Sequence, residues 1–489
     1  MLLEPARRSD TDEGGAVWPG AEVRPSSAAT LRWGLALAVA FGAAGILPFA
    51  FVHVDDVDGA VYHVIARHLA EDGRLLGLRF LPDYWPRFFE HPPLYFWIQA
   101  AVVRVASEAL LPWLGAAIGI ATVGVTYLTG RQLLGARAAL LGAFLLSSTE
   151  QFFRYQARPR LDPPLALAYT SSVALLLAAR GRTGWLVAGG LAAGMGALVK
   201  GPPAFGAPLS AALALVILGR GRELGRVRVW IAAAVATLLP AAALVAVDHV
   251  ALGGGWWDGY VRGQLFASMS GARMEGATNH AYLLGSLAGG FWPGVPFLVL
   301  AFLGAILTPR SARSRAVLAL VAWAAVIVAG FSFAGRSYWW YVVPAFMPLA
   351  LAAGAGLESI LQRAFADAGP RWGLRIFTGA GFLALALSPL WPERWLVRPC
   401  PFGDLPARAS TVAPAGTVLR LGASPGRGFT DLRAHAGWLA QHSGRDVIVT
   451  PRPGASAGVF EEPSPGVPAD WSVVARHGGW ALAVPRVAP

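Results

Sequence analysis

The sequence predicts an α-helical polytopic membrane protein with a small soluble α/β domain at its C-terminal end. Of its 489 residues, 55% are hydrophobic and only 14% are charged, whereas soluble domains average about 25% charged residues. Apolar runs of about 20 residues, the length that crosses a bilayer as a helix, recur along most of the chain. These runs stop after Trp395, where the soluble part is expected to begin.

Residues 1–30 form a polar segment rich in proline, glycine and serine. They lack the order of charged, apolar and small residues that is typical of a cleaved signal peptide. We therefore expect a disordered cytoplasmic tail, followed by a membrane domain over residues 31–397.

The apolar segments predict about 11 transmembrane helices, within a range of roughly 10 to 13. A further segment, 92–105, is too short to cross easily and contains Arg104, so we expect a re-entrant or interfacial helix in a first outer loop over 53–108. The predicted spans are 31–52, 109–130, 136–155, 161–180, 183–199, 202–219, 229–250, 282–307, 316–334, 338–361 and 372–391.

The basic residues predict the orientation of these spans. The formal net charge is +12, but the arginines fall in short loops, which indicates membrane topology and argues against a nucleic-acid-binding face. With those loops in the cytoplasm, the C-terminal domain and any chemistry face the outer side of the membrane. The single cysteine, Cys400, excludes an intrachain disulfide. The outer segments are then 53–92, 154–162, 251–281, 335–340 and 398–489.

Three aspartates follow the first predicted span: Asp55, Asp56 and Asp58. Acidic residues at a helix end are often only solvated boundary residues. Here the following residues have helical spacing, so Asp58 would lie at a helix N-terminus, where the helix dipole favours the ionised carboxylate. Such a carboxylate is suited to take a proton from a hydroxyl group.

Glu90 and His91 lie between aromatic residues and a Pro-Pro pair. They could orient an acceptor, contact a phosphate or bind a metal, or they could be incidental charges in an interfacial aromatic belt. His280 is predicted on the same side, so Glu90 and His280 are the candidate metal ligands. Two ligands do not define a metal site, and a divalent metal remains an open alternative.

Outer-side cations form the third group. Arg158 lies in a cluster with Arg154, Arg160 and Asp162, Lys200 is the only lysine of the chain, and Arg336 follows a later span. Cations at headgroup level suit an anionic phosphate, although arginines also extend toward lipid headgroups. An ionisable residue at membrane depth, such as Lys200, is a functional candidate.

Five motifs resemble the GT-C membrane glycosyltransferases in order and approximate spacing. The similarity covers about residues 31–361 and is greatest to the bacterial branch related to protein O-mannosyltransferases and to the aminoarabinose transferase of lipid A. The motifs are "DGAVYHVIARHL", "FEHPPLYFWIQA", "ARPRLDPPLALA", "GALVKGPPAF" and "FSFAGRSYWWYVVPAFMPLALAAG".

This resemblance implies transfer of a sugar from a polyprenyl-phosphate donor to an acceptor hydroxyl at the outer membrane face, with inversion. By register, Asp58 takes the place of the family's base, and Asp162 and Glu90 take the other acidic positions. Arg158, Lys200 and Arg336 are then expected at the donor phosphate. The residues expected to shape the acceptor side are Asp55, Asp56, His91, Tyr62 and Tyr95.

The chain departs from the family pattern at several positions. Asp58-Gly59 replaces the usual Asp-Glu pair, Arg336 stands where lysine is common, and the loop 251–281 lacks expected pairs. His91 follows the O-mannosyltransferase relatives, whereas the aminoarabinose branch tends to have lysine there. The acceptor is accordingly left open as a lipid, a glycan or a protein.

Residues 398–489 alternate β-like runs with Pro/Gly-rich turns and one helical stretch near 430–443, which predicts the small α/β domain. It is either a passive cap or a contributor to acceptor selection. Two other functions compete with an enzyme. A transporter or flippase of a lipid-linked substrate would usually have internal repeats, and none is evident here. An inactive family scaffold is the other alternative.

Overall fold

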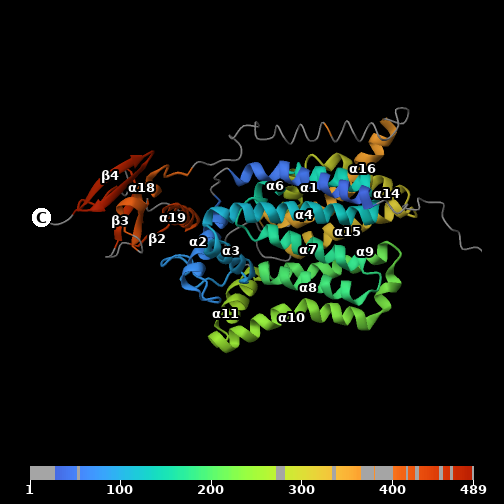
Figure 1. The fold of residues 1–489 in the computed structure, drawn as a ribbon, viewed down its shortest axis with the longest axis horizontal. Coiled ribbons are helices and arrows are strands. Elements are labelled where there is room, and N and C mark those ends of the chain that lie inside the picture. The colour runs from blue at the N-terminus through green and yellow to red at the C-terminus, as the bar shows by residue number, and fades with distance from the viewer. Residues whose placement is uncertain are drawn as a thin grey trace, which may run out of the picture.

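The computed structural model describes two parts, a helical bundle and a C-terminal α/β domain at one end of it (Figure 1). The predicted tail up to residue 27, the predicted span 372–391, and Asp55, His280 and Arg336 lie outside the described residues. Those residues are 28–51, 56–270, 281–332, 338–364, 379, 400–414, 417–423, 429–450, 455–462 and 466–486.

The bundle is held together by close helix contacts at small residues. A Cβ on Gly190 would lie 2.2 Å from the carbonyl oxygen of Ala233, and one on Gly354 would lie 2.4 Å from that of Ala138. Glycine therefore permits the backbones to approach, as is common between membrane helices. The long helices are α1 (Ala28–Ala50), α4 (Leu111–Leu134), α5 (Ala136–Ser147), α7 (Asp162–Ala178), α8 (Thr183–Lys200), α9 (Gly206–Ile217), α10 (Val227–Leu252), α14 (Val295–Leu307), α15 (Ala312–Ser332) and α16 (Phe346–Ala364).

The protein is a multi-pass membrane protein, but the predicted count of about 11 spans is not confirmed. Among the described residues, five helices are long and apolar enough to cross a bilayer, or six if a bent pair forms one span. The predicted span 282–307 is that pair, α13 (Ala281–Gly290) and α14, bent by 111°. The break contains Pro293, which removes a backbone donor, and Gly294. Other predicted spans form shorter helices, such as α5 and α9.

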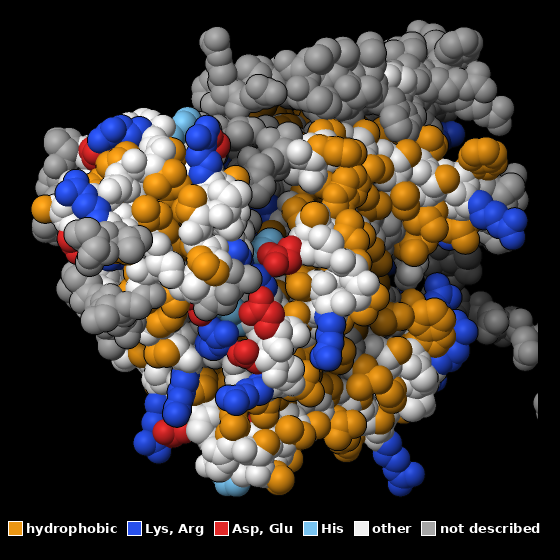
Figure 2. Space-filling view, turned by 60° about the vertical axis from the view of Figure 1, so that its left-hand side comes forward, with side chains coloured by type: hydrophobic (Ala, Val, Ile, Leu, Met, Phe, Trp, Pro, Cys, Tyr) orange, Lys and Arg blue, Asp and Glu red, His pale blue; other side chains and the backbone are white. Residues whose placement is uncertain are grey.

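Hydrophobic side chains are exposed over the sides of the bundle, as expected of a lipid-facing surface. On α10 they include Ile231, Val235 and Leu239, and on α14 they include Leu300 and Leu303. Figure 2 shows such side chains over much of the bundle, and acidic side chains gathered where it meets the C-terminal domain.

Short elements gather at the end of the bundle next to that domain. The predicted short helix is present as α3 (Leu94–Val105). The helix expected after the aspartates is α2 (Val57–Asp72), and its N-cap is Asp56, whose carboxylate accepts a hydrogen bond from the Gly59 amide at 3.0 Å. Asp58 is the second residue of α2. The other short elements at this end are η1 (Glu108–Leu110), α6 (Glu150–Gln156), η2 (Pro202–Phe205), α11 (Gly255–Asp258), η4 (Gly259–Phe266), α12 (Ala267–Met269) and η5 (Trp339–Ala345). The short helix η3 (Gly221–Gly225) instead joins α9 to α10 at the opposite end of the bundle (Figure 1).

The C-terminal part is a five-stranded sheet of order β2-β1-β3-β5-β4. Strand β1 pairs parallel with β2 and β3, and β5 pairs antiparallel with β3 and β4. The predicted strands and helix are present, whereas β3 and α18 were not predicted. The elements are α18 (Leu405–Val412), β1 (Val418–Gly422), α19 (Phe429–Ser443), β2 (Asp446–Ile448), β3 (Ala455–Glu461), β4 (Trp471–His477) and β5 (Trp480–Pro485).

This domain is fixed to α2 and to the loop that follows it. Arg67 donates to the Ala440 carbonyl at 3.0 Å, and His68 Nε2 lies 2.7 Å from Asp446 Oδ1. One oxygen of Asp83 accepts hydrogen bonds from the Val449 and Thr450 amides, at 2.8 and 3.0 Å. These buried and half-buried contacts place α19 against the end of the bundle.

Candidate active site

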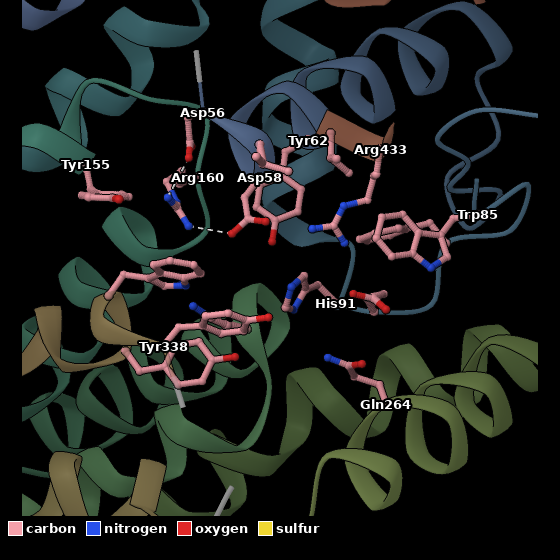
Figure 3. Close-up of a pocket in the computed structure, with 17 residues that line it drawn as sticks. Asp56, Asp58, Tyr62, Trp85, His91, Tyr155, Arg160, Gln264, Tyr338 and Arg433 are labelled. Carbon is pink, nitrogen blue, oxygen red and sulfur yellow. Dashed lines mark hydrogen bonds and ion pairs between the residues drawn. The ribbon is translucent and has the colours of Figure 1, made fainter. Parts of the chain in front are cut away.

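A cavity of about 220 Å³ opens at this end of the bundle. Side chains from α2, the loop before α3, α6, α8, η4, η5 and α19 line it (Figure 3). Its lining includes both charged and aromatic groups: Asp56, Asp58, Tyr62, Trp85, Phe88, Glu90, His91, Tyr155, Arg160, Lys200, Gln264, Tyr338, Trp340, Tyr341 and Arg433.

Arg160 organises the acidic groups of the cavity. Its guanidinium donates to Asp56 Oδ1 at 2.9 Å and to Asp58 Oδ2 at 2.6 Å. Its Nε lies 3.4 Å from Asp162 Oδ2, and its side chain is only 2% exposed. The planar, permanently charged guanidinium can hold carboxylates from several directions. Arg160 therefore ties the start of α2 to the start of α7.

Two aromatic rings contact this guanidinium on adjoining sides. The Cζ atom of Arg160 lies 4.3 Å from the ring centre of Tyr155 and 4.7 Å from that of Trp340. Tyr338 stacks on Trp340, with ring centres 4.5 Å apart. Such contacts favour a cation, so the two rings on adjoining sides and the carboxylates together fix the orientation of Arg160.

Lys200 ends α8 and forms an ion pair with Asp162, the first residue of α7. Its Nζ also lies 4.9 Å from the ring centre of Tyr341. The helix ends there because Gly201 has φ +82°, and a Cβ at that position would clash with Tyr260. The proline pair 202–203 follows. The end of the helix thus places Lys200 at the inner side of the cavity.

The environment changes the proton affinity of two charged groups. Burial raises the pKa of Asp58 above its ordinary value, and the charge of Arg160 opposes this rise. Burial alone lowers the pKa of Arg160, but Asp56 and Asp58 raise it overall. Asp58 is therefore a more basic carboxylate than an exposed aspartate, beside a group that stays positive.

A second, largely apolar pocket of about 500 Å³ adjoins the cavity. It shares Glu90, His91, Lys200, Gln264 and Tyr341 with the cavity. From there it continues between apolar side chains of α7, α9, η4 and α15, among them Leu165, Leu209, Leu265, Val326 and Ile327. A charged chamber is thus continuous with a hydrophobic pocket, and Lys200 lies at the junction.

The structure brings together most of the residues that the sequence singled out. Asp56, Asp58, Tyr62, Glu90, His91 and Lys200 line the cavity, and Asp162 contacts it through Arg160 and Lys200. Arg158 and Tyr95 are buried nearby but do not line it. Asp55, Arg336 and His280 lie outside the described residues.

Sequence reasoning missed three contributors. Arg160 was noted only as part of the arginine cluster, although its place two residues before Asp162 is a usable signal. Trp85 lies in the aromatic stretch before Glu90, where no single ring is distinguished. Arg433 comes from the C-terminal domain, and no local pattern connects it with residues more than 300 positions earlier.

The metal alternative has little support from the described side chains. Within the described ranges, no group of three or more His, Cys, Asp or Glu residues is placed to hold a metal ion. Glu90 lies at the cavity without such a set around it.

Known proteins share this architecture. The family model described as dolichyl-phosphate-mannose-protein mannosyltransferase matches residues 90–246. The crystal structure of ArnT from Cupriavidus metallidurans bound to undecaprenyl phosphate superposes with a TM-score of 0.70 at 16% identity, over 94% of this chain and 98% of that one. The chain has the fold of the GT-C membrane glycosyltransferases. The resemblance seen in the sequence motifs is confirmed.

Two further comparisons show how far this similarity in fold extends. The oligosaccharyltransferase of Archaeoglobus fulgidus in its apo form matches with a TM-score of 0.52 at 14% identity, over 88% of this chain and 69% of that one. The apo ArnT structure gives 0.68 at 16% identity, over 93% and 98%. No curated protein sequence matches the chain. At these identities the likeness establishes the GT-C fold alone.

Proposed function

We propose that this protein transfers a sugar from a polyprenyl-phosphate donor to an acceptor hydroxyl at the outer face of a bacterial cytoplasmic membrane. The observation that carries the proposal is the continuity of the cavity around Asp58 with the apolar pocket, with Lys200 at their junction. A lipid-linked phosphate needs this combination: a cation for the head and an apolar pocket for the tail.

Asp58 acts as the general base in this proposal. One of its oxygens is held by Arg160, and the carboxylate lies in the middle of the cavity (Figure 3). Its raised pKa makes it a stronger base than an exposed aspartate. Arg160 fixes the carboxylate and keeps Asp56 and Asp162 in place, so it acts as a positioning residue.

Lys200 stabilises the leaving phosphate. Its side chain is 9% exposed and lies at the end of the cavity next to the apolar pocket. Asp162 holds it and partly neutralises it, which leaves donor N–H bonds of the ammonium for an incoming phosphate oxygen. Arg158 and Arg336 remain further candidates from the sequence.

The reaction is a single displacement. The acceptor O–H proton passes to the Asp58 carboxylate while the acceptor oxygen bonds to the anomeric carbon. The bond between that carbon and the phosphate oxygen breaks, and polyprenyl phosphate leaves with the electron pair. The products are an inverted glycoside and the lipid phosphate. Preformed charges around the reacting atoms provide most of the stabilisation in such sites.

A carrier for a lipid-linked substrate is the second candidate, because the apolar pocket would also suit a transported lipid. The gathering of Asp58, Glu90, Arg160 and Lys200 at one end of the bundle favours the enzyme. A carrier would instead require polar groups along a path between both faces.

The test uses purified protein in lipid vesicles with a panel of labelled polyprenyl-phosphate sugars. Acceptor-dependent loss of one donor, with a stoichiometric rise of free polyprenyl phosphate, is the expected result. Movement of the labelled lipid across the bilayer without cleavage would establish a carrier and overturn the proposal. A matched vesicle without protein controls for spontaneous hydrolysis and movement.

A further inference from the structure

The C-terminal domain places one side chain inside the cavity: Arg433, on α19. Its guanidinium carbon lies 5.0 Å from the ring centre of Trp85. Its buried Nε has no hydrogen-bond partner, and within the described ranges the guanidinium makes no ion pair. A buried cation normally has a carboxylate partner, because desolvation without one is costly. Arg433 is half-buried, and its charge acts on the Asp58 carboxylate without forming an ion pair with it, so its N–H groups can receive a further anion.

Trp85, whose ring contacts Arg433, has a strained backbone conformation. It has φ 50°, a left-handed conformation that a tryptophan rarely adopts. Two backbone hydrogen bonds fix the turn around it, from the Phe80 amide to the Trp85 carbonyl and from the Leu81 amide to the Tyr84 carbonyl, both at 2.9 Å. Strain of this kind persists where the surroundings enforce it and often marks a ligand-binding element.

The same turn is attached to the domain that carries Arg433. Asp83, two residues before Trp85, accepts the hydrogen bonds from the Val449 and Thr450 amides. On α19 itself, Gly437 lies close to Phe80: a Cβ there would be 3.2 Å from that ring. Trp85 and Arg433 are therefore fixed relative to each other by two independent sets of contacts.

Arg433 and Lys200 occupy different ends of the cavity. Lys200 adjoins the apolar pocket, whereas Arg433 and Trp85 do not line that pocket. In Figure 3, Asp58 and Tyr62 lie between Arg160 on one side and Arg433 and Trp85 on the other. Stacking on Trp85 leaves the in-plane N–H groups of Arg433 free to bind two oxygens of one anion in a fork.

We propose that Arg433 is a specificity-determining residue, contributed by the C-terminal domain, that binds an anionic oxygen group of the acceptor. That group is a phosphate or a carboxylate carried near the hydroxyl that Asp58 deprotonates. The inference rests on the proposed function, because it assumes that an acceptor binds in the cavity. Anion binding at Arg433, however, does not depend on sugar transfer. The inference also assigns the C-terminal domain a part in the site.

The experiment measures anion binding in full-length protein in nanodiscs, saturated with undecaprenyl phosphate so that the Lys200 end is occupied. Labelled inorganic phosphate and glucuronate are titrated by equilibrium dialysis, with glucose as the neutral probe. We expect Arg433→Gln to weaken binding of an anion roughly ten- to hundredfold, the effect of losing a charge-assisted bond pair. We expect Arg433→Lys to retain part of the anion binding. The anion that binds identifies the group as phosphate or carboxylate.

The matched control is Arg476→Gln, which removes an exposed arginine of the same domain whose partner is Glu462. Its anion binding should equal that of the wild type. Undecaprenyl phosphate affinity, unchanged in Arg433→Gln, shows that this variant is folded. Wild-type anion affinity in Arg433→Gln would overturn the inference, as would the absence of anion binding in the wild type. Arg433-dependent binding without any sugar transfer would instead refute the proposed function and leave the anion site standing.

Discussion

Arg160 donates a 2.6 Å hydrogen bond to Asp58, across 102 positions of sequence. The same guanidinium contacts Asp56 at the N-cap of α2 and Asp162 at the start of α7. One buried cation therefore fixes the proposed base and both helix starts. The site is built on helix ends held by ion pairs to Arg160, and the rings of Tyr155 and Trp340 contact the same guanidinium.

The first prediction concerns Arg160 as a structural centre. Arg160→Gln removes the cation that pairs with Asp56 and Asp58 and leaves Asp162 with Lys200 alone. Breaking a buried pair in this way costs about 3–5 kcal/mol. We expect a lower unfolding temperature and loss of transfer. Arg262→Gln, which removes an exposed arginine paired with Asp258, should change neither. An Arg160→Gln protein of wild-type stability would contradict the assigned role.

The second prediction separates lipid binding from chemistry. Lys200→Gln removes the cation next to the apolar pocket, so undecaprenyl phosphate affinity should fall about ten- to hundredfold. Lys200→Arg should retain part of the affinity because the charge is kept. Binding is measured by titration of the labelled lipid into nanodiscs. Arg182→Gln, at the other end of α8, is the matched control, and an equal loss there would refute a specific role of Lys200.

The third prediction is a pH profile. Asp58 is active as a base only when deprotonated, and its pKa is raised. Transfer should therefore be lost as the pH falls through a value above the ordinary aspartate pKa, and it should be constant above that value until another group titrates. Transfer rates between about pH 4 and 8 test this. An acid limb at or below the ordinary value would show that burial does not control the base.

The fourth prediction concerns docking of the C-terminal domain. Burial alone raises the pKa of Asp446, but its hydrogen bond to His68 and the charge of Arg79 lower it overall. Stability from this contact is therefore present above the ordinary carboxyl pKa and is lost as pH falls through the lowered one. Asp446→Asn should remove that dependence.

Hydrogen exchange at the Val449 and Thr450 amides reports this docking. Asp83→Ala should also raise their exchange, because both amides lose their acceptor, and a typical hydrogen bond contributes about 0.5–1.5 kcal/mol. Asp470→Asn, an exposed change in the same domain, provides the comparison. Unchanged protection in Asp83→Ala would mean that other contacts hold the domain.

Much of the fold could be predicted because its signals are local. The apolar runs of α1, α4, α10 and α15 appear directly in composition, and the β-like runs of β4 and β5 are visible in a short window. The span count is not confirmed, because local breaks intervene in several apolar runs. A proline and glycines lie at the bend before α14, and α5 ends after 12 residues. An apolar run therefore need not form one straight span.

Some residues of the candidate site could likewise be predicted from local signals, and others could not. Asp58, Lys200 and Glu90 could be predicted because each is an unusual charge beside an apolar run or a helix start. Arg433 could not, since it reaches the cavity only through the docking of α19 on α2. The importance of Arg160 over Arg158 also depends on three-dimensional placement, because both lie in one short stretch and only Arg160 faces the carboxylates.

The most direct test of the account is single-turnover transfer by Asp58→Asn. Asparagine keeps the size of the side chain but cannot take a proton, so the variant should bind the donor with wild-type affinity and fail to consume it. The predicted result is a fall in the chemical step of at least about 100-fold, the usual contribution of a general base. Asp258→Asn, an exposed aspartate on α11, should react normally. Turnover by Asp58→Asn at the wild-type rate would contradict the central claim.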